Sequence, residues 1–246
     1  MHDFRKLPLL VFGLFACAAA HADDYRFELG ANFDHVSFDN DAPDVDILSV
    51  AGTFYLKPVP TDGVPLAEAA FLNRSSFVNA GVSRVDVDGD HADVFGANFG
   101  YYIPNTIFYG RIGVLKFDDA FGFDDDTTVN GTFGVAPFDG LLITTEFDED
   151  GWNPNATARY VGKFDNGHFY AASINVVDPD DENVEVGANF DYFFDPTFSV
   201  GGGLSSDRLE VRAEKFFMPN FSVGGRVYTD DDSDGDGLAA FVKWRF

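Results

Sequence analysis

The sequence predicts an all-β protein, a transmembrane antiparallel up-and-down β-barrel of about fourteen strands, with twelve as the alternative count. Two observations lead to this fold class. Apolar and polar residues alternate along one segment after another, and short turn-forming connections alternate with longer acidic ones. Period-two alternation is typical of a strand with two different environments. A barrel that spans a lipid bilayer has apolar outward residues, short turns at one end and longer loops at the other.

The first 22 residues have the pattern of a secretory signal peptide, which is removed before folding. Arg5 and Lys6 precede an apolar run, and residues 20–22 form a small-x-small cleavage site. The run is shorter than the roughly 18 apolar residues that a membrane anchor needs. A lipoprotein-like stretch ends at Cys17, so lipidation there stays open as an alternative to cleavage. The expected mature domain, 23–246, contains no cysteine and therefore no disulfide framework.

The expected strands follow from this alternation. The last one closes the chain on an apolar stripe that ends in Phe246, and we expect it to pair with the first strand and close the barrel. Lipid demands closure because unpaired backbone groups in hydrocarbon cost several kcal/mol each. Segment 141–147 has the weakest pattern, which is why twelve strands remain the alternative. The predicted strands are 24–37, 47–57, 75–85, 93–103, 107–117, 127–136, 141–147, 154–164, 168–177, 183–194, 198–205, 208–217, 221–228 and 238–246.

The connections differ in charge between the two ends of the predicted barrel. One set is short and rich in turn formers such as Asn-Gly and Pro-Asn, and most of these turns follow an aromatic residue. The other set holds 26 acids and no Lys or Arg, in 38–46, 86–93, 118–126, 148–150, 178–182, 206–207 and 229–237. A soluble β-sandwich, the alternative fold, would not need this split. The net charge of −25 also argues against nucleic acid as a partner, because phosphates need cationic surfaces.

Most basic residues of the mature chain share the polar face of their strands, together with several acids. Exclusion of charge from hydrocarbon is enough to explain this placement, at about 2–4 kcal/mol per misplaced base. A functional interpretation is that opposed arginines and acids set a transverse field and a size limit in the pore. The predicted pore-lining residues are Arg26, Arg111, Arg159, Lys163, Arg208, Arg212, Arg226, Lys243, Arg245, Glu28, Glu146, Glu185, Asp191 and Glu210.

The segment PLAEAAFL, residues 65–72, lies in the longest turn-side connection and has helix-favouring composition. We favour a short helix on the surface. The alternative is a partial plug, with Phe71 and Leu72 packed at the periplasmic mouth. On the opposite side, the sequence offers no long loop that could fold into the lumen and narrow it.

The sequence contains candidates for two further kinds of site. Asp230, Asp232, Asp234 and Asp236 resemble the opening of a calcium loop, but residue 241 is Phe where an EF-hand has a bidentate Glu. A weak divalent-cation site, with Ca²⁺ loosely bound at the outer loops, stays open as a hypothesis; otherwise we expect no cofactor. The mature chain has only three histidines, and none belongs to a catalytic motif, so we expect no enzyme activity.

Three stretches carry a resemblance to a known family: YRFELGANFD near the mature start, KPVPTDGVPLAEAAFLNRSS at 57–76, and the terminal Phe. The chain resembles the putative general bacterial porin family over essentially its whole mature length. This resemblance implies a water-filled channel in the outer membrane of Gram-negative bacteria, through which ions and small hydrophilic solutes diffuse passively. A solute-specific channel and an occluded structural barrel are the alternatives.

The expected partners follow from the same resemblance. They are outer-membrane lipid and lipopolysaccharide, the barrel assembly machinery, which reads an aromatic final residue on an alternating strand, and small solutes. The sequence leaves open whether the protein is a monomer or a trimer.

Overall fold

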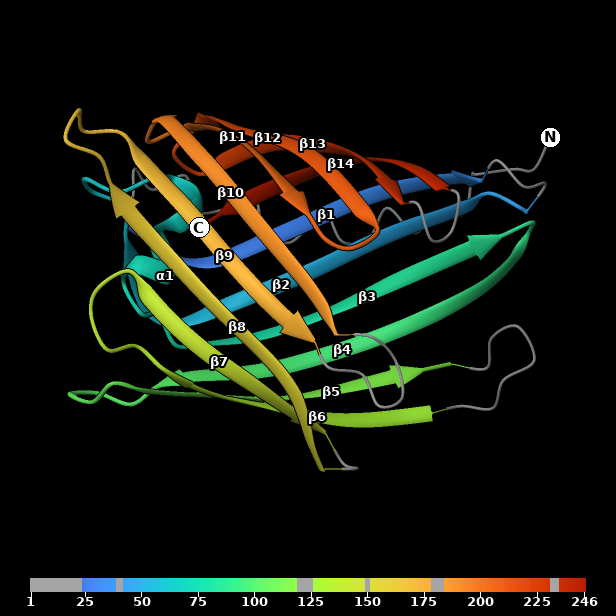
Figure 1. The fold of residues 1–246 in the computed structure, drawn as a ribbon, viewed down its shortest axis with the longest axis horizontal. Coiled ribbons are helices and arrows are strands. Elements are labelled where there is room, and N and C mark those ends of the chain that lie inside the picture. The colour runs from blue at the N-terminus through green and yellow to red at the C-terminus, as the bar shows by residue number, and fades with distance from the viewer. Residues whose placement is uncertain (1–23, 39–41, 119–125, 149–150, 178–183, 231–234) are drawn as a thin grey trace.

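The computed structural model describes residues 24–38, 42–118, 126–148, 151–177, 184–230 and 235–246. Within these residues, fourteen antiparallel strands form one closed barrel, in which β1 pairs with β14 (Figure 1). The strands are β1 (Asp24–Phe38), β2 (Val45–Pro60), β3 (Phe77–Val87), β4 (Asp90–Tyr102), β5 (Phe108–Phe117), β6 (Asp126–Val135), β7 (Leu141–Asp148), β8 (Gly151–Lys163), β9 (Phe169–Val177), β10 (Glu185–Asp195), β11 (Phe198–Leu204), β12 (Arg208–Met218), β13 (Phe221–Asp230) and β14 (Gly235–Arg245). The fold class and the count of fourteen are confirmed. The twelve-strand alternative is wrong, because β7 pairs with both β6 and β8.

Closure of the barrel joins the first and last strands in a register that separates two faces. Glu28 lies opposite Arg245, and Gly30 lies opposite Lys243, on the lumen side. Leu29 lies opposite Trp244 on the outer side. The terminal apolar stripe therefore has a partner stripe of the same character, and no strand edge remains in this ring.

The outer face carries the large apolar side chains, and the inner face carries the polar ones. Ile112 and Val211 keep 58% and 52% of their surface exposed, which leaves them available to lipid. In contrast, Asp34 and Arg245 are only 4% and 3% exposed, because they pack against other side chains inside the barrel.

Aromatic rings gather at the end of the barrel that carries the short turns. Trp244 stacks on Phe246 with ring centroids 6.1 Å apart, and Phe194 stacks on Phe198 at 5.4 Å. Amphipathic and aromatic rings at this level are typical of the interface between hydrocarbon and head groups. This end, which carries the chain terminus, is called the turn end below; the other is the loop end.

Among the residues that the structure describes, helical structure is confined to the connection between β2 and β3. A 3₁₀ turn, η1 (Leu66–Glu68), leads directly into one turn of helix, α1 (Ala69–Leu72). Figure 1 shows α1 at the turn end, near the C-terminus. No helix in the described part of the chain is long and apolar enough to cross a membrane. The predicted signal peptide and Cys17 lie outside the described residues.

One glycine on the lumen face is required by the ring beside it. A Cβ atom added at Gly237 would lie 2.0 Å from Cζ of Tyr228. The Tyr228 ring is held in place, because its hydroxyl donates to Asp34 at 3.0 Å and the Arg208 guanidinium carbon lies 3.6 Å from the ring centre.

We therefore expect Gly237→Ala to lower the free energy of unfolding by about 1–3 kcal/mol, the usual cost of overpacking. Urea titration of the refolded protein in detergent measures this change. Gly30→Ala is the matched control, because the nearest atom to its added Cβ lies 3.9 Å away. Equal stability of the two variants would contradict the argument.

Candidate functional site

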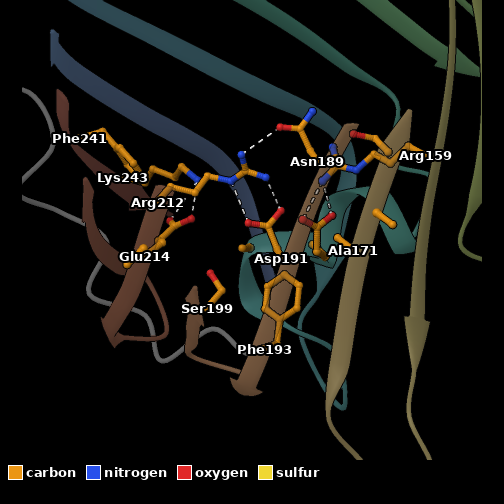
Figure 2. Close-up of a pocket in the computed structure, with 15 residues that line it drawn as sticks. Arg159, Ala171, Asn189, Asp191, Phe193, Ser199, Arg212, Glu214, Phe241 and Lys243 are labelled. Carbon is orange, nitrogen blue, oxygen red and sulfur yellow. Dashed lines mark hydrogen bonds and ion pairs between the residues drawn. The ribbon is translucent and has the colours of Figure 1, made fainter. Parts of the chain in front are cut away.

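The lumen is the candidate site, and one part of its wall is densely charged. On β12, Arg212 donates from Nε and Nη2 to the two carboxylate oxygens of Asp191, both at 2.8 Å. Its Nη1 reaches Asn189 at 3.1 Å and Glu210 at 2.9 Å. Glu210 also accepts from Arg208 at 3.3 Å. One guanidinium, whose orientation is fixed by a bidentate pair, thus joins β12 to β10 (Figure 2).

The same wall continues through β13, β14 and β1. Arg226 forms an ion pair with Asp34, which also accepts the Tyr228 hydroxyl at 3.0 Å. Lys243 lies 3.0 Å and 3.1 Å from the two oxygens of Glu214. Every cation in this group therefore sits beside a carboxylate, so the wall is strongly polar with little net charge.

The wall formed by β2 to β7, across the closed barrel, is mainly uncharged. Ser49 and Ser83 share a hydrogen bond of 2.8 Å on its inner surface. Among the described lumen residues of this wall, Arg111 forms an ion pair with Glu146 at 2.9 Å. Arg111 also donates to Thr132 at 3.1 Å. The lumen thus has one wall of paired charges and one wall that is nearly uncharged.

We expected the connection between β2 and β3 to lie on the surface. It instead crosses the turn end of the barrel. The backbone N–H of Leu66 donates to the carbonyl of Pro196, at 2.7 Å. The Leu66 carbonyl accepts from Arg245 at 2.8 Å. These contacts tie the segment to β14 and to the turn between β10 and β11. We call residues 65–72 the turn plug.

An ion pair anchors the middle of the turn plug to the far wall. Arg159 on β8 donates from Nη2 to both oxygens of Glu68, each at 2.7 Å. The Arg159 guanidinium also lies 4.9 Å from the centre of the Phe71 ring, within reach of a cation–π interaction. One arginine therefore holds both the acidic and the aromatic residue of this segment.

The apolar residues of the turn plug pack on the inner wall. Phe71 and Leu72 contact a buried cluster of Val161, Ala171 and Phe193, from β8, β9 and β10. These three wall residues occupy lumen-facing positions where a porin with an open mouth would meet water. Contact with these wall residues explains why the segment lies inside the mouth of the barrel and not on its surface. Each buried large apolar side chain contributes about 1.5–3 kcal/mol to stability.

Glu68 is the one carboxyl of the turn plug and is 6% exposed. Burial raises the pKa of the Glu68 carboxyl above its ordinary value, and the adjacent Arg159 opposes this rise. An unpaired carboxylate at this depth would be costly, so the Arg159 contact is what makes the charged form acceptable.

Arg26 was predicted to line the pore, and this prediction is wrong. The backbone N–H groups of Arg26 and Phe27 both donate to the carbonyl of Phe246, at 2.6 Å and 3.1 Å. Pairing with β2 is irregular at the same point. Such a β-bulge adds one residue to the strand and breaks the alternation. Arg26 consequently lies over Phe54, an outward ring that is 44% exposed, at 5.1 Å.

Two other predicted site residues lie at the ends of their strands. Lys163 lies at the rim of the turn end, 5.0 Å from the Phe169 ring centre. Glu185 begins β10 opposite Val177, at the loop end. Of the predicted divalent-cation residues, Asp232 and Asp234 lie outside the described residues, and the part that is described contains no cluster of potential metal ligands.

Sequence reasoning missed three residues that organise the site. Glu68 anchors the turn plug, Asn189 orients Arg212, and Tyr228 supports Asp34. Only Glu68 left a usable signal, since it is the single charged residue among the apolar residues of 64–72. The connection that contains it is also far longer than the other turns at this end.

Comparison with known proteins agrees with this architecture. The family model described as putative general bacterial porin matches residues 7–111. The porin resemblance is confirmed. The match is narrower than the whole mature chain, over which the likeness was expected, but it includes the turn plug. No curated protein matches the chain by sequence.

One solved structure shares the fold of this chain, and others are more distantly similar. Omp33, an outer-membrane protein of Acinetobacter baumannii, is similar with a TM-score of 0.74 at 21% identity, over 91% of this chain and 99% of that one. OprB of Pseudomonas putida, at 10% identity, covers 91% of this chain and 93% of its own with a TM-score of 0.49. The chain therefore shares a barrel fold with an outer-membrane protein and resembles the putative general bacterial porin family over residues 7–111.

Proposed function

We propose that this protein is a porin that passes ions and small hydrophilic solutes down their gradients and that its loop end favours cations. The observation that carries the proposal is the closed barrel with a balanced, ion-paired lumen behind an acidic entrance. Described acids at this entrance include Asp44, Asp46, Asp86, Asp88 and Asp90, and they raise the local concentration of cations. Since the lumen charges largely cancel, the entrance decides the selectivity.

Several expectations belong to the same proposal. The channel works without a cofactor and catalyses no reaction. Its described histidines lie at both ends of the barrel: His35 contacts Asp46 and His91 lies opposite Asp86 at the loop end, whereas His168 contacts Tyr192 at the turn end. The exposed apolar belt and the aromatic C-terminus support contacts with lipid, lipopolysaccharide and the barrel assembly machinery.

Planar-bilayer recording of the refolded mature protein tests the proposal. We expect discrete conductance steps and, under a KCl gradient, a reversal potential that indicates preference for K⁺ over Cl⁻. Replacing Asp86, Asp88 and Asp90 by Asn should lower this preference, and the effect should fade at about 1 M salt, where the Debye length is about 3 Å. Asparagine tolerates the positive φ of 53° at position 88.

The matched control neutralises three acids at the turn end, Asp62, Asp139 and Asp165, and should change the preference less. If the loop-end substitutions leave the K⁺/Cl⁻ permeability ratio unchanged, the selectivity part of the proposal is contradicted. Persistent absence of conductance from folded protein would contradict the channel and favour an occluded structural barrel. The turn plug is the feature that gives this second candidate its support.

A further inference from the structure

A cavity of about 460 Å³ lies in the lumen between the turn plug and the charged wall. Its volume falls in the range of small-molecule sites, about 300–1,000 Å³. Figure 2 shows side chains from several strands pointing into it, with Lys243 and Phe241 at one side and Arg159 at the other. The cavity is therefore bounded by groups that are distant in sequence and that converge on one space.

The charges around this cavity come in equal numbers of each sign. Its basic residues are Arg159, Arg212 and Lys243, and its acidic residues are Glu68, Asp191 and Glu214. Because these charges sum to zero, a simple anion or cation gains little from entering. A solute that carries both signs gains from each, since charge-assisted hydrogen bonds are about twice as strong as neutral ones.

The lining groups retain hydrogen-bonding capacity beyond their mutual ion pairs. Both bonds from Arg159 to Glu68 start at Nη2, so the N–H groups on Nε and Nη1 are not used by this pair. The side chain of Arg159 remains 43% exposed. Each oxygen of Asp191 has two lone pairs, and Arg212 occupies one on each.

We propose that this cavity is a binding subsite for small zwitterionic solutes of the free amino acid class. The solute carboxylate binds at Arg159 and its ammonium binds at Asp191, while the Lys243–Glu214 pair on the opposite side of the cavity binds the polar end of the solute side chain (Figure 2). Arg212 acts as the positioning residue, because its bonds to Asp191, Asn189 and Glu210 hold the acidic side of the cavity in place. The proposal rests on the channel function above and adds a preferred solute class to it.

Equilibrium dialysis tests the subsite without requiring conductance. The folded protein in detergent is dialysed against radiolabelled L-glutamine, and then against the same label with unlabelled competitors. We expect saturable binding that unlabelled L-glutamine displaces. Glutaramate, which lacks the ammonium, and 4-aminobutanamide, which lacks the carboxylate, should each compete at least about tenfold less well, because each loses one charged contact.

Two charge-conserving double variants locate the site. Lys243→Gln with Glu214→Gln removes one ion pair from the cavity and should raise the dissociation constant about tenfold. Arg111→Gln with Glu146→Gln removes a similar pair from β5 and β7, outside the cavity, and should leave L-glutamine binding unchanged. Heat-modifiable migration in gel electrophoresis identifies the folded fraction of each variant.

The outcomes separate the two proposals. Non-saturable binding, equal competition by the two truncated analogues, or equal effects of the two double variants would overturn the subsite, whatever the conductance. Saturable, zwitterion-selective binding to a protein that gives no conductance steps would keep the subsite and reject the channel.

Discussion

Deletion of the turn plug, residues 65–72, is expected to raise the single-channel conductance severalfold. The segment crosses the turn end of the lumen and is fixed at Leu66 and Glu68, so it occupies space that ions would otherwise use. The eight residues that remain between Pro60 and Phe77 are enough for a loop between the two strands. Conductance in symmetric KCl, recorded before and after the deletion, is the measurement.

The variant Glu68→Gln distinguishes the effect of loosening the turn plug from the effect of removing it. This variant keeps the chain length and the apolar contacts of Phe71 and Leu72, but it loses the charge that Arg159 binds. We expect larger current noise and a smaller rise in mean conductance than the deletion gives. If the deletion leaves the conductance unchanged, the turn plug is not the constriction, and the narrow point must lie at the charged wall.

Arg245→Ala is expected to cause the largest loss of stability among single substitutions in the lumen, about 3–5 kcal/mol. Arg245 is 3% exposed and donates to Glu28 at 2.6 Å and to the Leu66 carbonyl at 2.8 Å. Its guanidinium lies between the rings of Tyr25 and Phe216, at 4.4 Å and 4.6 Å. Truncation leaves the Glu28 carboxylate without this partner and opens a cavity between two rings.

Urea unfolding in detergent, followed by tryptophan fluorescence, measures this loss. Lys215→Ala is the control, because Lys215 lies at the turn end in a solvent-exposed pair, 3.7 Å from Asp195. Its loss should cost less than about 1 kcal/mol, as is usual for surface pairs. A comparable cost for the two variants would mean that burial of Arg245 contributes little.

The sequence was sufficient for the barrel but not for its interior. Strand number and the two faces follow from local alternation, because lipid and lumen impose opposite demands on neighbouring residues. Arg26 shows where this reasoning stops: one bulge shifts the parity, and the bulge depends on pairing with Phe246 at the other end of the chain. No local pattern records such a pairing.

The docked position of the turn plug could not be predicted from the sequence, for a related reason. Its helix-favouring composition is compatible both with a surface helix and with a docked one. The choice depends on Arg159, 91 residues away in sequence, and on Arg245, 179 residues from Leu66. Only the three-dimensional arrangement of β8 and β14 brings these arginines to the same mouth.

The dependence of the turn plug on Arg245 has a consequence for the order of biogenesis. Arg245 lies on the last strand and binds both Glu28 of the first strand and the carbonyl of Leu66. A nascent barrel that has not yet accepted its final hairpin therefore lacks this anchor for the plug. Docking of the segment becomes favourable only when the seam between β1 and β14 has formed, so a closed seam and a seated plug mature together.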